Sequence, residues 1–313
     1  MDILSLADRT ARSFALTLRL LPASVREELC LAYLLARASD SVADAANRPA
    51  GERIDLLNGM AIALEASDVA RFPVAGVDAF AAHVHHRGEA DLLGHFGQLT
   101  GMFFAQHGDA VERGSRVLAT IISGQLADVE RGAGAHPAVL ADEPALLDYT
   151  WRVAGCVGSY WTEVLAANVP GALAQPLPAM MELGKRYGQG LQLLNILRDA
   201  PQDWQDRRCY LPLPPGVPTP LPPDPAGLPL LFRLMRARIG QCRDWLDDGL
   251  RYSDGILGWR MRAATALPAA LGHETLNALA LADEAAWLKR VKISRPSLRR
   301  AAFHAVLDAL LRW

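Results

Sequence analysis

The chain has few cysteines, and no two of them lie close together in the sequence. Cys30, Cys156, Cys209 and Cys242 lie far apart among 313 residues, and no Cys-x-x-Cys pair occurs. This distribution argues against a structural zinc site and against a disulfide framework. We therefore expect a protein of a reducing compartment, the cytoplasm.

Long apolar runs and an excess of positive charge are also missing. No run approaches the ~20 apolar residues that a membrane span needs, and the first ten residues show no signal peptide pattern. We expect a soluble protein, or at most one peripheral to a membrane. The formal net charge of −2 argues against a nucleic-acid-binding face.

Alternating β-branched runs bounded by turns are absent as well, so no sheet is predicted. Instead the chain is rich in Ala, Leu, Arg and Glu, with apolar residues at three- and four-residue spacing. This pattern predicts an all-α protein, with helices at 24–46, 52–67, 75–106, 111–131, 143–168, 173–200, 229–252, 258–288 and 296–312.

One segment departs from this composition. Residues 211–229 hold nine of the twenty prolines, so they form an extended, non-helical connector. A domain boundary and an SH3-type ligand are alternatives, but we favour a stiff loop between two helices of one domain. No internal repeat is evident.

Two apolar helices carry polar stripes where a core is expected. Helical spacing of three and four residues places two sets of side chains on one face each: Tyr33, Arg37, Asp40 and Asp44 in the first, and Gln192, Asn195, Asp199 and Asp203 in the second.

Carboxylates at this spacing repel each other. Asp40 and Asp44 lie ~6 Å apart along the helix axis, and their repulsion is about 0.7 kcal/mol in water and roughly 3 kcal/mol at an effective dielectric constant of 20. Divalent cations relieve such repulsion, and Mg²⁺ accepts a few carboxylates together with water and phosphate oxygens. The stripes therefore predict a diphosphate held through Mg²⁺ between two facing helices. A buried salt-bridge network is the alternative.

The Asp-x-x-x-Asp spacing alone is weak, because Asp244 and Asp248 share it within an ordinary helix face. The histidines at 83, 85 and 86 form a second candidate metal site. No third ligand stands at a suitable spacing, so we interpret them as a solvated surface cluster.

Four segments resemble the squalene/phytoene synthase family in the same order along the chain. They are ARSFALTLRLLP at 11–22, YLLARASDSVAD at 33–44, YTWRVAGCVGSY at 149–160 and LQLLNILRDAPQDWQDRRCYLP at 191–212. The two acidic motifs begin 159 residues apart (199 − 40), which is typical of this family. The resemblance implies a single all-α domain over 1–313, an isoprenoid-synthase-type helical bundle around a central cavity.

The resemblance also assigns site residues. The metal ligands are Asp40, Asp44, Asn195, Asp199 and Asp203. The tyrosines that line the catalytic cavity are Tyr33, Tyr149 and Tyr210. Diphosphate binding is assigned to Gln192, Arg37, Arg198 and Arg208, and more weakly to Lys292. Arg12, Ser13 and Phe14 match a flap over the first diphosphate, although Ala11 replaces its leading serine.

Two further matches leave a question open. Gly155 and Gly158 match small residues that leave room for prenyl tails, and close helix packing explains them equally well. Where the family has a glutamate before its last aspartate, this chain has Gln202, preceded by Pro201. Proline is expected to kink or end the helix and to displace Asp203.

The resemblance implies head-to-head condensation of two farnesyl diphosphates through presqualene diphosphate to squalene, with Mg²⁺ and NADPH. The stretch LLARASDSVADA is closer to squalene synthases than to phytoene synthases. Alternatives are condensation of two geranylgeranyl diphosphates, and an enzyme that stops at presqualene diphosphate or hydroxysqualene. An inactive member that acts as a binding or assembly protein is an alternative of another class.

Overall fold

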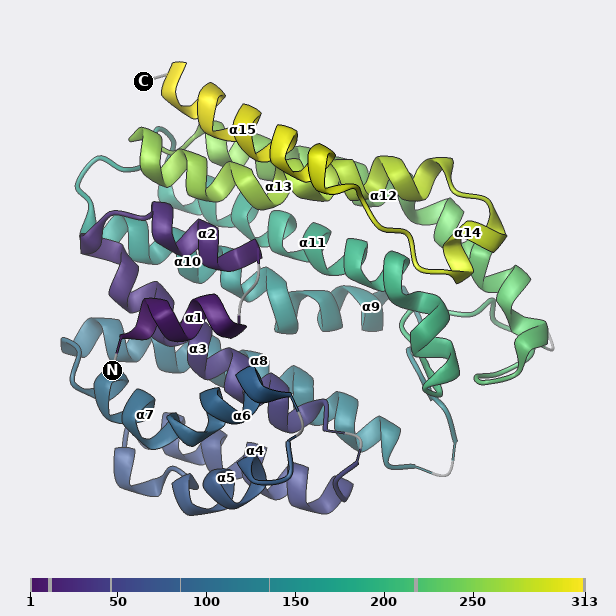
Figure 1. Ribbon diagram of the computed structural model, residues 1–313, viewed down its shortest axis with the longest axis horizontal. Coiled ribbons are helices and arrows are strands. Elements are labelled where there is room, and N and C mark those ends of the chain that lie inside the picture. The colour runs from purple at the N-terminus through teal and green to yellow at the C-terminus, as the bar shows by residue number, and fades with distance from the viewer. Residues whose placement is uncertain are drawn as a thin grey trace. The chain divides into compact units, whose positions relative to one another are not determined.

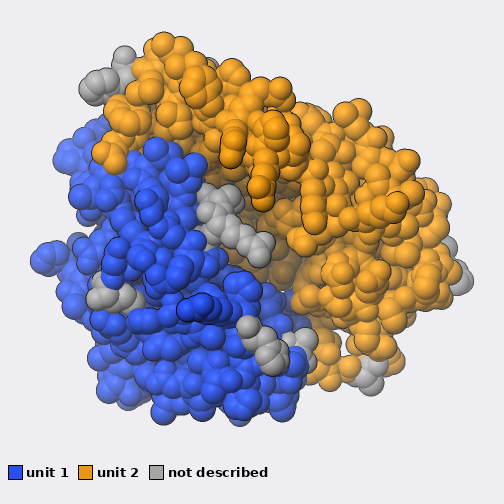
Figure 2. Space-filling model, in the orientation of Figure 1, with its two compact units in different colours: residues 1–130, 160–172 blue, residues 131–159, 173–313 orange. Residues whose placement is uncertain are grey.

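The computed structural model describes residues 2–10, 13–45, 47–84, 86–134, 136–216 and 219–311. The chain forms two compact units (Figure 2). Unit 1 comprises residues 1–130 and 160–172, and unit 2 comprises residues 131–159 and 173–313. The single-domain organisation stays a prediction, whereas the all-α class is confirmed (Figure 1).

Unit 1 is built around one helix, α3 (Ala23–Ala43), which packs against α1, α2, α4, α6 and α7. Its apolar face is buried, with Leu31, Leu34 and Ala38 fully inaccessible. The other elements that contribute to unit 1 are α1 (Ile3–Thr10), α2 (Ser13–Leu20), α4 (Ala50–Glu65), η1 (Val69–Arg71), α5 (Val74–Ala81), α6 (Arg87–Gly94), α7 (Phe96–Phe104) and α8 (Gly108–Gly132).

Unit 2 is built around α11 (Leu177–Gln205), which packs against α12, α13, α9 and the turn η2. Its core contains Leu193, Leu197 and the buried indoles of Trp204 and Trp287. The other elements are β1 (Ala138–Val139), α9 (Glu143–Thr150), η2 (Trp151–Gly155), β2 (Arg208–Cys209), η3 (Pro225–Gly227), α12 (Leu228–Asp254), α13 (Trp259–Leu281), α14 (Glu284–Leu288) and α15 (Arg295–Leu311). Helix α10 (Cys156–Asn168) begins in unit 2, and its residues from 160 onward belong to unit 1. In Figure 1, α11, α12, α13 and α15 run as neighbouring long helices.

Several boundaries follow from local chemistry. The Asp142 carboxylate accepts a hydrogen bond from the Ala145 amide at 2.9 Å and caps α9, as the sequence predicts. Where one helix was predicted over 75–106, the chain forms α5, α6 and α7. One break lies before α6, where the His86 ring accepts a hydrogen bond from the Glu89 amide at 3.4 Å.

Other differences have simple causes. Helices α1 and α2 were not predicted, because eight residues are too few to show a clear period. The two-residue parallel pairing of β1 with β2 was missed for the same reason. In the proline-rich connector, the described residues up to 227 contain only the short η3, as expected of a non-helical segment, and α12 begins at Leu228, so the connector ends two residues before the predicted 229.

Of the two expectations for Pro201, a kink or an end of the helix, the end is wrong, because α11 continues to Gln205. A proline at 201 cannot donate to the carbonyl of Leu197 four residues earlier. The buried Trp287 indole supplies the missing donor, with Nε1 at 2.9 Å from the Leu197 oxygen. A side chain thus replaces the lost backbone hydrogen bond, and Asp203 stays on the helix.

No described helix is both long and apolar enough to cross a membrane.

Candidate active site

The first acidic pair lies at the end of α3. Asp44 is the exposed residue that ends the helix, and its amide donates to the Asp40 carbonyl at 2.8 Å. The Asp40 carboxylate has two neighbours. Its Oδ1 accepts from Gln125 Nε2 of α8 at 2.6 Å, and its Oδ2 lies 3.5 Å from the Arg37 guanidinium.

Arg37 neutralises Asp40 only weakly, because it is held elsewhere. Its Nη2 donates to Glu89 Oε1 of α6 at 2.8 Å, a closer contact than the 3.5 Å to Asp40. Glu89 therefore keeps the guanidinium beside the aspartate without a close ion pair.

The electrostatics of Asp40 reflect this arrangement. Desolvation raises the pKa of its carboxyl to about 6, and the charge of Asp44 adds to the rise, while Arg37 and the Gln125 hydrogen bond oppose it. Water still reaches 48% of the Asp40 side chain, so its desolvation is partial. The charge of Asp40 is only weakly offset by Arg37, and a cation would relieve it.

The second acidic pair, on α11 in unit 2, is more strongly compensated. Asp199 accepts from Arg198 at 2.9 and 2.5 Å, and from Arg290 at 2.9 Å. Asp203 lies 3.5 Å from Arg208. The exposed Asn195 amide donates to Gln192 Oε1 at 3.5 Å, one turn before this pair. The predicted polar stripe is therefore present, and arginines already accompany its carboxylates.

The predicted tyrosines occupy aromatic clusters. Tyr149 of α9 stacks on Tyr210, which directly follows β2, with ring centroids 4.8 Å apart and planes at 16°. The Arg131 guanidinium lies 5.9 Å from the Tyr149 ring centroid. In unit 1, Phe14 packs on Tyr33 at 4.9 Å, and burial raises the pKa of Tyr33 to about 12.

The two predicted glycines sit at tight helix contacts within unit 2. A Cβ on Gly158 would lie 1.8 Å from the Gly184 carbonyl oxygen, and one on Gly155 would lie 2.9 Å from the Gln189 side chain. Close helix packing therefore explains both positions. A role for these glycines toward prenyl tails stays a prediction.

For three further assigned residues the structure gives little or no information about a site. Arg12 lies outside the described residues, as does the side chain of Ser13. Lys292 is exposed in the segment between α14 and α15. Two residues before it, Arg290 makes the contact with Asp199.

Sequence reasoning missed Gln125, Glu89 and Arg290. Arg290 stands beside the basic match at Lys292, which was a usable signal. Gln125 is a polar residue inside an apolar stretch of α8, a pattern like the one that marked the two stripes. Glu89 had no such signal, because it lies on a short polar helix.

The residues present fit Mg²⁺ in kind, since carboxylate and amide oxygens are its usual protein ligands. Within the described ranges, no cluster of three or more His, Cys, Asp or Glu side chains is suited to a metal. Any Mg²⁺ at these pairs would therefore need oxygens from a bound diphosphate or from water.

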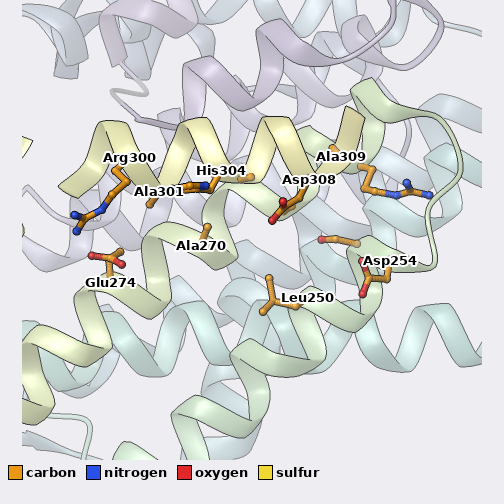
Figure 3. A pocket seen from close by; sticks show the side chains of 13 residues that line it. Leu250, Asp254, Ala270, Glu274, Arg300, Ala301, His304, Asp308 and Ala309 are labelled. Carbon is orange, nitrogen blue, oxygen red and sulfur yellow. The ribbon is translucent and has the colours of Figure 1, made fainter. Parts of the chain in front are cut away.

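Among the described residues of unit 2, a hollow and a narrow gap bear on the site. The hollow, of about 360 Å³, lies between α12, α13 and α15 (Figure 3). Alanines line much of it, and Glu274 and Arg300 are among its polar residues. No assigned site residue lines it. A narrow gap beside α11 is lined by Asp203 and Tyr210, two of the assigned residues.

Known proteins show what this chain is similar to. A presqualene diphosphate synthase of Zymomonas mobilis is 28% identical over 252 residues, 78% of this chain and 70% of that protein. A 4,4'-diapophytoene synthase of Staphylococcus haemolyticus is 37% identical over 78 residues, 25% of each chain. A squalene synthase of Gibberella zeae is 26% identical over 215 residues, 65% of this chain and 41% of that protein. The last two matches span less than two thirds of those relatives.

Solved structures share the fold. The complex of TcSQS with the ligand BPH1237 has a TM-score of 0.76 at 18% identity, covering 99% of this chain and 89% of that one. A dehydrosqualene synthase in complex with a ligand has a TM-score of 0.60 at 18% identity, covering 99% of this chain and 96% of that one. The family model described as squalene/phytoene synthase matches residues 7–297. The chain belongs to the squalene/phytoene synthase family.

Proposed function

We propose that this chain is a Mg²⁺-dependent prenyl transferase that condenses two farnesyl diphosphates head to head, through presqualene diphosphate, to squalene. The observation that carries the proposal is the pair of acidic stripes. The central helix of each unit bears two aspartates one turn apart, with arginines beside them. Family membership supplies the reaction class.

The residues divide into three roles. Asp40 and Asp44, together with Asn195, Asp199 and Asp203, would hold Mg²⁺, which when bound supplies Lewis acidity at the leaving oxygen of the diphosphate. Arg37, Arg198 and Arg208 take up the negative charge of the diphosphate. Because Arg198 and Arg290 now bond Asp199, an incoming diphosphate would share or replace these contacts.

The aromatic residues protect and stabilise positive charge. Ionisation of one farnesyl diphosphate leaves an allylic cation, which the 2,3 double bond of the second molecule attacks. Loss of one proton closes the cyclopropane of presqualene diphosphate. The stacked rings of Tyr149 and Tyr210 offer π faces to such a cation and exclude water from it.

The proton lost on ring closure would pass to a tyrosine or to the released diphosphate. The pKa of Tyr33 is raised to about 12, first by burial, so the phenol stays protonated near neutral pH and is a poor base. We therefore favour the released diphosphate over Tyr33 as the proton acceptor. In a second step, ionisation and rearrangement of presqualene diphosphate followed by hydride transfer from NADPH would give squalene and a second diphosphate.

Two observations favour farnesyl substrates over geranylgeranyl diphosphate. Two of the similar proteins carry the names presqualene diphosphate synthase and squalene synthase, and the first motif is closer to squalene synthases. An enzyme that stops at presqualene diphosphate or hydroxysqualene is the second candidate, favoured by the match to the presqualene diphosphate synthase over 78% of this chain.

The test is product analysis. Purified protein is incubated with farnesyl or geranylgeranyl diphosphate and Mg²⁺, with and without NADPH, and extracts are analysed by mass spectrometry. We expect a C30 product from farnesyl diphosphate that EDTA abolishes. Asp40→Asn and Asp199→Asn should lose it, while Asp244→Asn should retain it, because Asp244 is the exposed member of the Asp244/Asp248 pair, whose second aspartate is buried. No coupled product from either diphosphate would instead support an inactive binding protein.

A further inference from the structure

Gln125 is an amide buried beside the first acidic pair. It lies on α8, its exposed fraction is 6%, and its Nε2 donates to Asp40 Oδ1 at 2.6 Å. Both residues belong to unit 1. A contact this short to a carboxylate is a strong, charge-assisted hydrogen bond.

The other end of the same amide lacks a protein partner. Within the described residues, Gln125 Oε1 is buried and accepts no hydrogen bond. Leaving a buried acceptor unsatisfied costs about 1–3 kcal/mol. The amide cannot improve its position by turning over, because an ionised Asp40 needs the N–H side and would repel the oxygen.

Burial without a partner does not by itself indicate a ligand. Ser115, on the same helix, is also buried and its Oγ has no hydrogen-bond partner in the described part of the chain. What distinguishes Gln125 is its direct contact with an aspartate of the acidic motif. Its donor is committed to Asp40, while its acceptor stays available beside that carboxylate.

We propose that Gln125 is a positioning residue for the first metal-binding pair. Its N–H fixes Asp40 Oδ1, and its Oε1 accepts a hydrogen bond from water that enters with the cation. This inference rests on the proposed function, because it assumes that Asp40 binds Mg²⁺ together with a diphosphate. Groups that orient metal ligands in this way commonly change metal affinity by about 10- to 100-fold.

The test is the Mg²⁺ requirement for ligand binding. Titration calorimetry with inorganic pyrophosphate, repeated over a series of Mg²⁺ concentrations, gives the half-saturating Mg²⁺ concentration without any turnover. For Gln125→Met, which fills the space with an apolar side chain, we expect this concentration to rise about 10- to 100-fold. Ser115→Ala, the matched control on α8, should leave it unchanged, and thermal unfolding reports whether each variant folds.

A double-mutant cycle separates positioning from general packing. Asp40→Asn should weaken Mg²⁺-dependent binding, and adding Gln125→Met should produce little further loss, since Gln125 is proposed to act on the metal only through the Asp40 carboxylate. If Gln125→Met does not fold, Gln125→Asn, whose amide is retracted by one methylene, replaces it and should also raise the half-saturating Mg²⁺ concentration.

Three outcomes would overturn the inference. An unchanged Mg²⁺ requirement in a folded Gln125 variant, with binding weakened by Asp40→Asn, refutes the positioning role and leaves the proposed function standing. Fully additive losses in the cycle show that Gln125 acts independently of Asp40. Unchanged binding in Asp40→Asn removes the metal site itself, and the role of Gln125 with it.

Discussion

Tyr149 and Tyr210 stack face to face, with ring centroids 4.8 Å apart, although one ends a helix and the other follows a strand. The pair brings together two segments recognised separately in the sequence. Substitution of phenylalanine for a tyrosine keeps the aromatic ring and removes the hydroxyl, so the two contributions can be measured separately.

We expect Tyr210→Phe to lose less stability and coupling activity than Tyr210→Leu, because the ring and its contact with Tyr149 remain. Tyr210→Leu should lower the free energy of unfolding by about 1–3 kcal/mol, since this buried position loses an aromatic contact worth about 0.5–1.5 kcal/mol together with packing. Urea denaturation and product assays check both. Equal loss in the two variants would show that the hydroxyl is what matters.

Neutralising one aspartate should change the free energy of unfolding in opposite directions at the two acidic pairs. Asp40→Asn removes a charge that Asp44 repels, so stability should stay the same or rise slightly. Asp199→Asn leaves Arg198 and Arg290 without their shared carboxylate, and stability should fall by about 1 kcal/mol, a small value because these side chains are partly exposed.

The measurement is urea denaturation of both variants without Mg²⁺. Asp244→Asn is the exposed control, with no expected change. A marked loss of stability in Asp40→Asn would contradict our description of its charge as poorly compensated.

Close packing at Gly158 predicts intolerance of any side chain. Gly158→Ala places a Cβ 1.8 Å from the Gly184 carbonyl oxygen, so helix α10 must shift from α11. We expect a loss of about 1–3 kcal/mol or more. Gly240→Ala is the matched control, because nothing lies within 4 Å of a Cβ there on α12. It should stabilise the protein by about 0.5–1 kcal/mol. Thermal unfolding distinguishes the two.

Trp287 supplies the hydrogen bond that Pro201 cannot donate, and a double-mutant cycle tests this role. Trp287→Phe removes the indole N–H and leaves the Leu197 carbonyl unsatisfied, which should cost about 1–3 kcal/mol. In a Pro201→Ala background, the alanine amide can donate to that carbonyl, so the same change should cost less. Equal costs in both backgrounds, measured by urea denaturation, would mean that the indole acts only through packing.

The four cysteines predict a loss of stability at alkaline pH. Burial raises the pKa of each thiol from 9.0 to about 12. Because the folded state holds these protons more tightly, their contribution is fully present below pH 9 and is lost as the pH rises from 9 toward 12. Native protein should also react slowly with a thiol reagent at pH 8, whereas unfolded protein reacts at all four sites. Rapid labelling of the native state would contradict this burial.

Much of this arrangement follows from the sequence, because helical spacing fixes which side chains share a face. The stripes that end in Asp44 and Asp203 lie on α3 and α11 as predicted. What failed depends on contacts between distant segments. The continuation of α11 needs an indole from α14, and the hold on Asp40 needs an amide from α8. The sequence marks Gln125 only as a polar residue inside an apolar stretch and gives no sign of Glu89, so their contacts with Asp40 and Arg37 came from the structure.

The sharing of Arg37 between two carboxylates has an energetic consequence for ligand entry. The guanidinium lies 2.8 Å from Glu89 and 3.5 Å from Asp40, so its contact with Asp40 is the weaker of the two. If Arg37 binds a diphosphate, as we propose, it would give up the longer contact first. The contact with Glu89 would then hold the side chain near its binding position and lower the conformational entropy lost on binding.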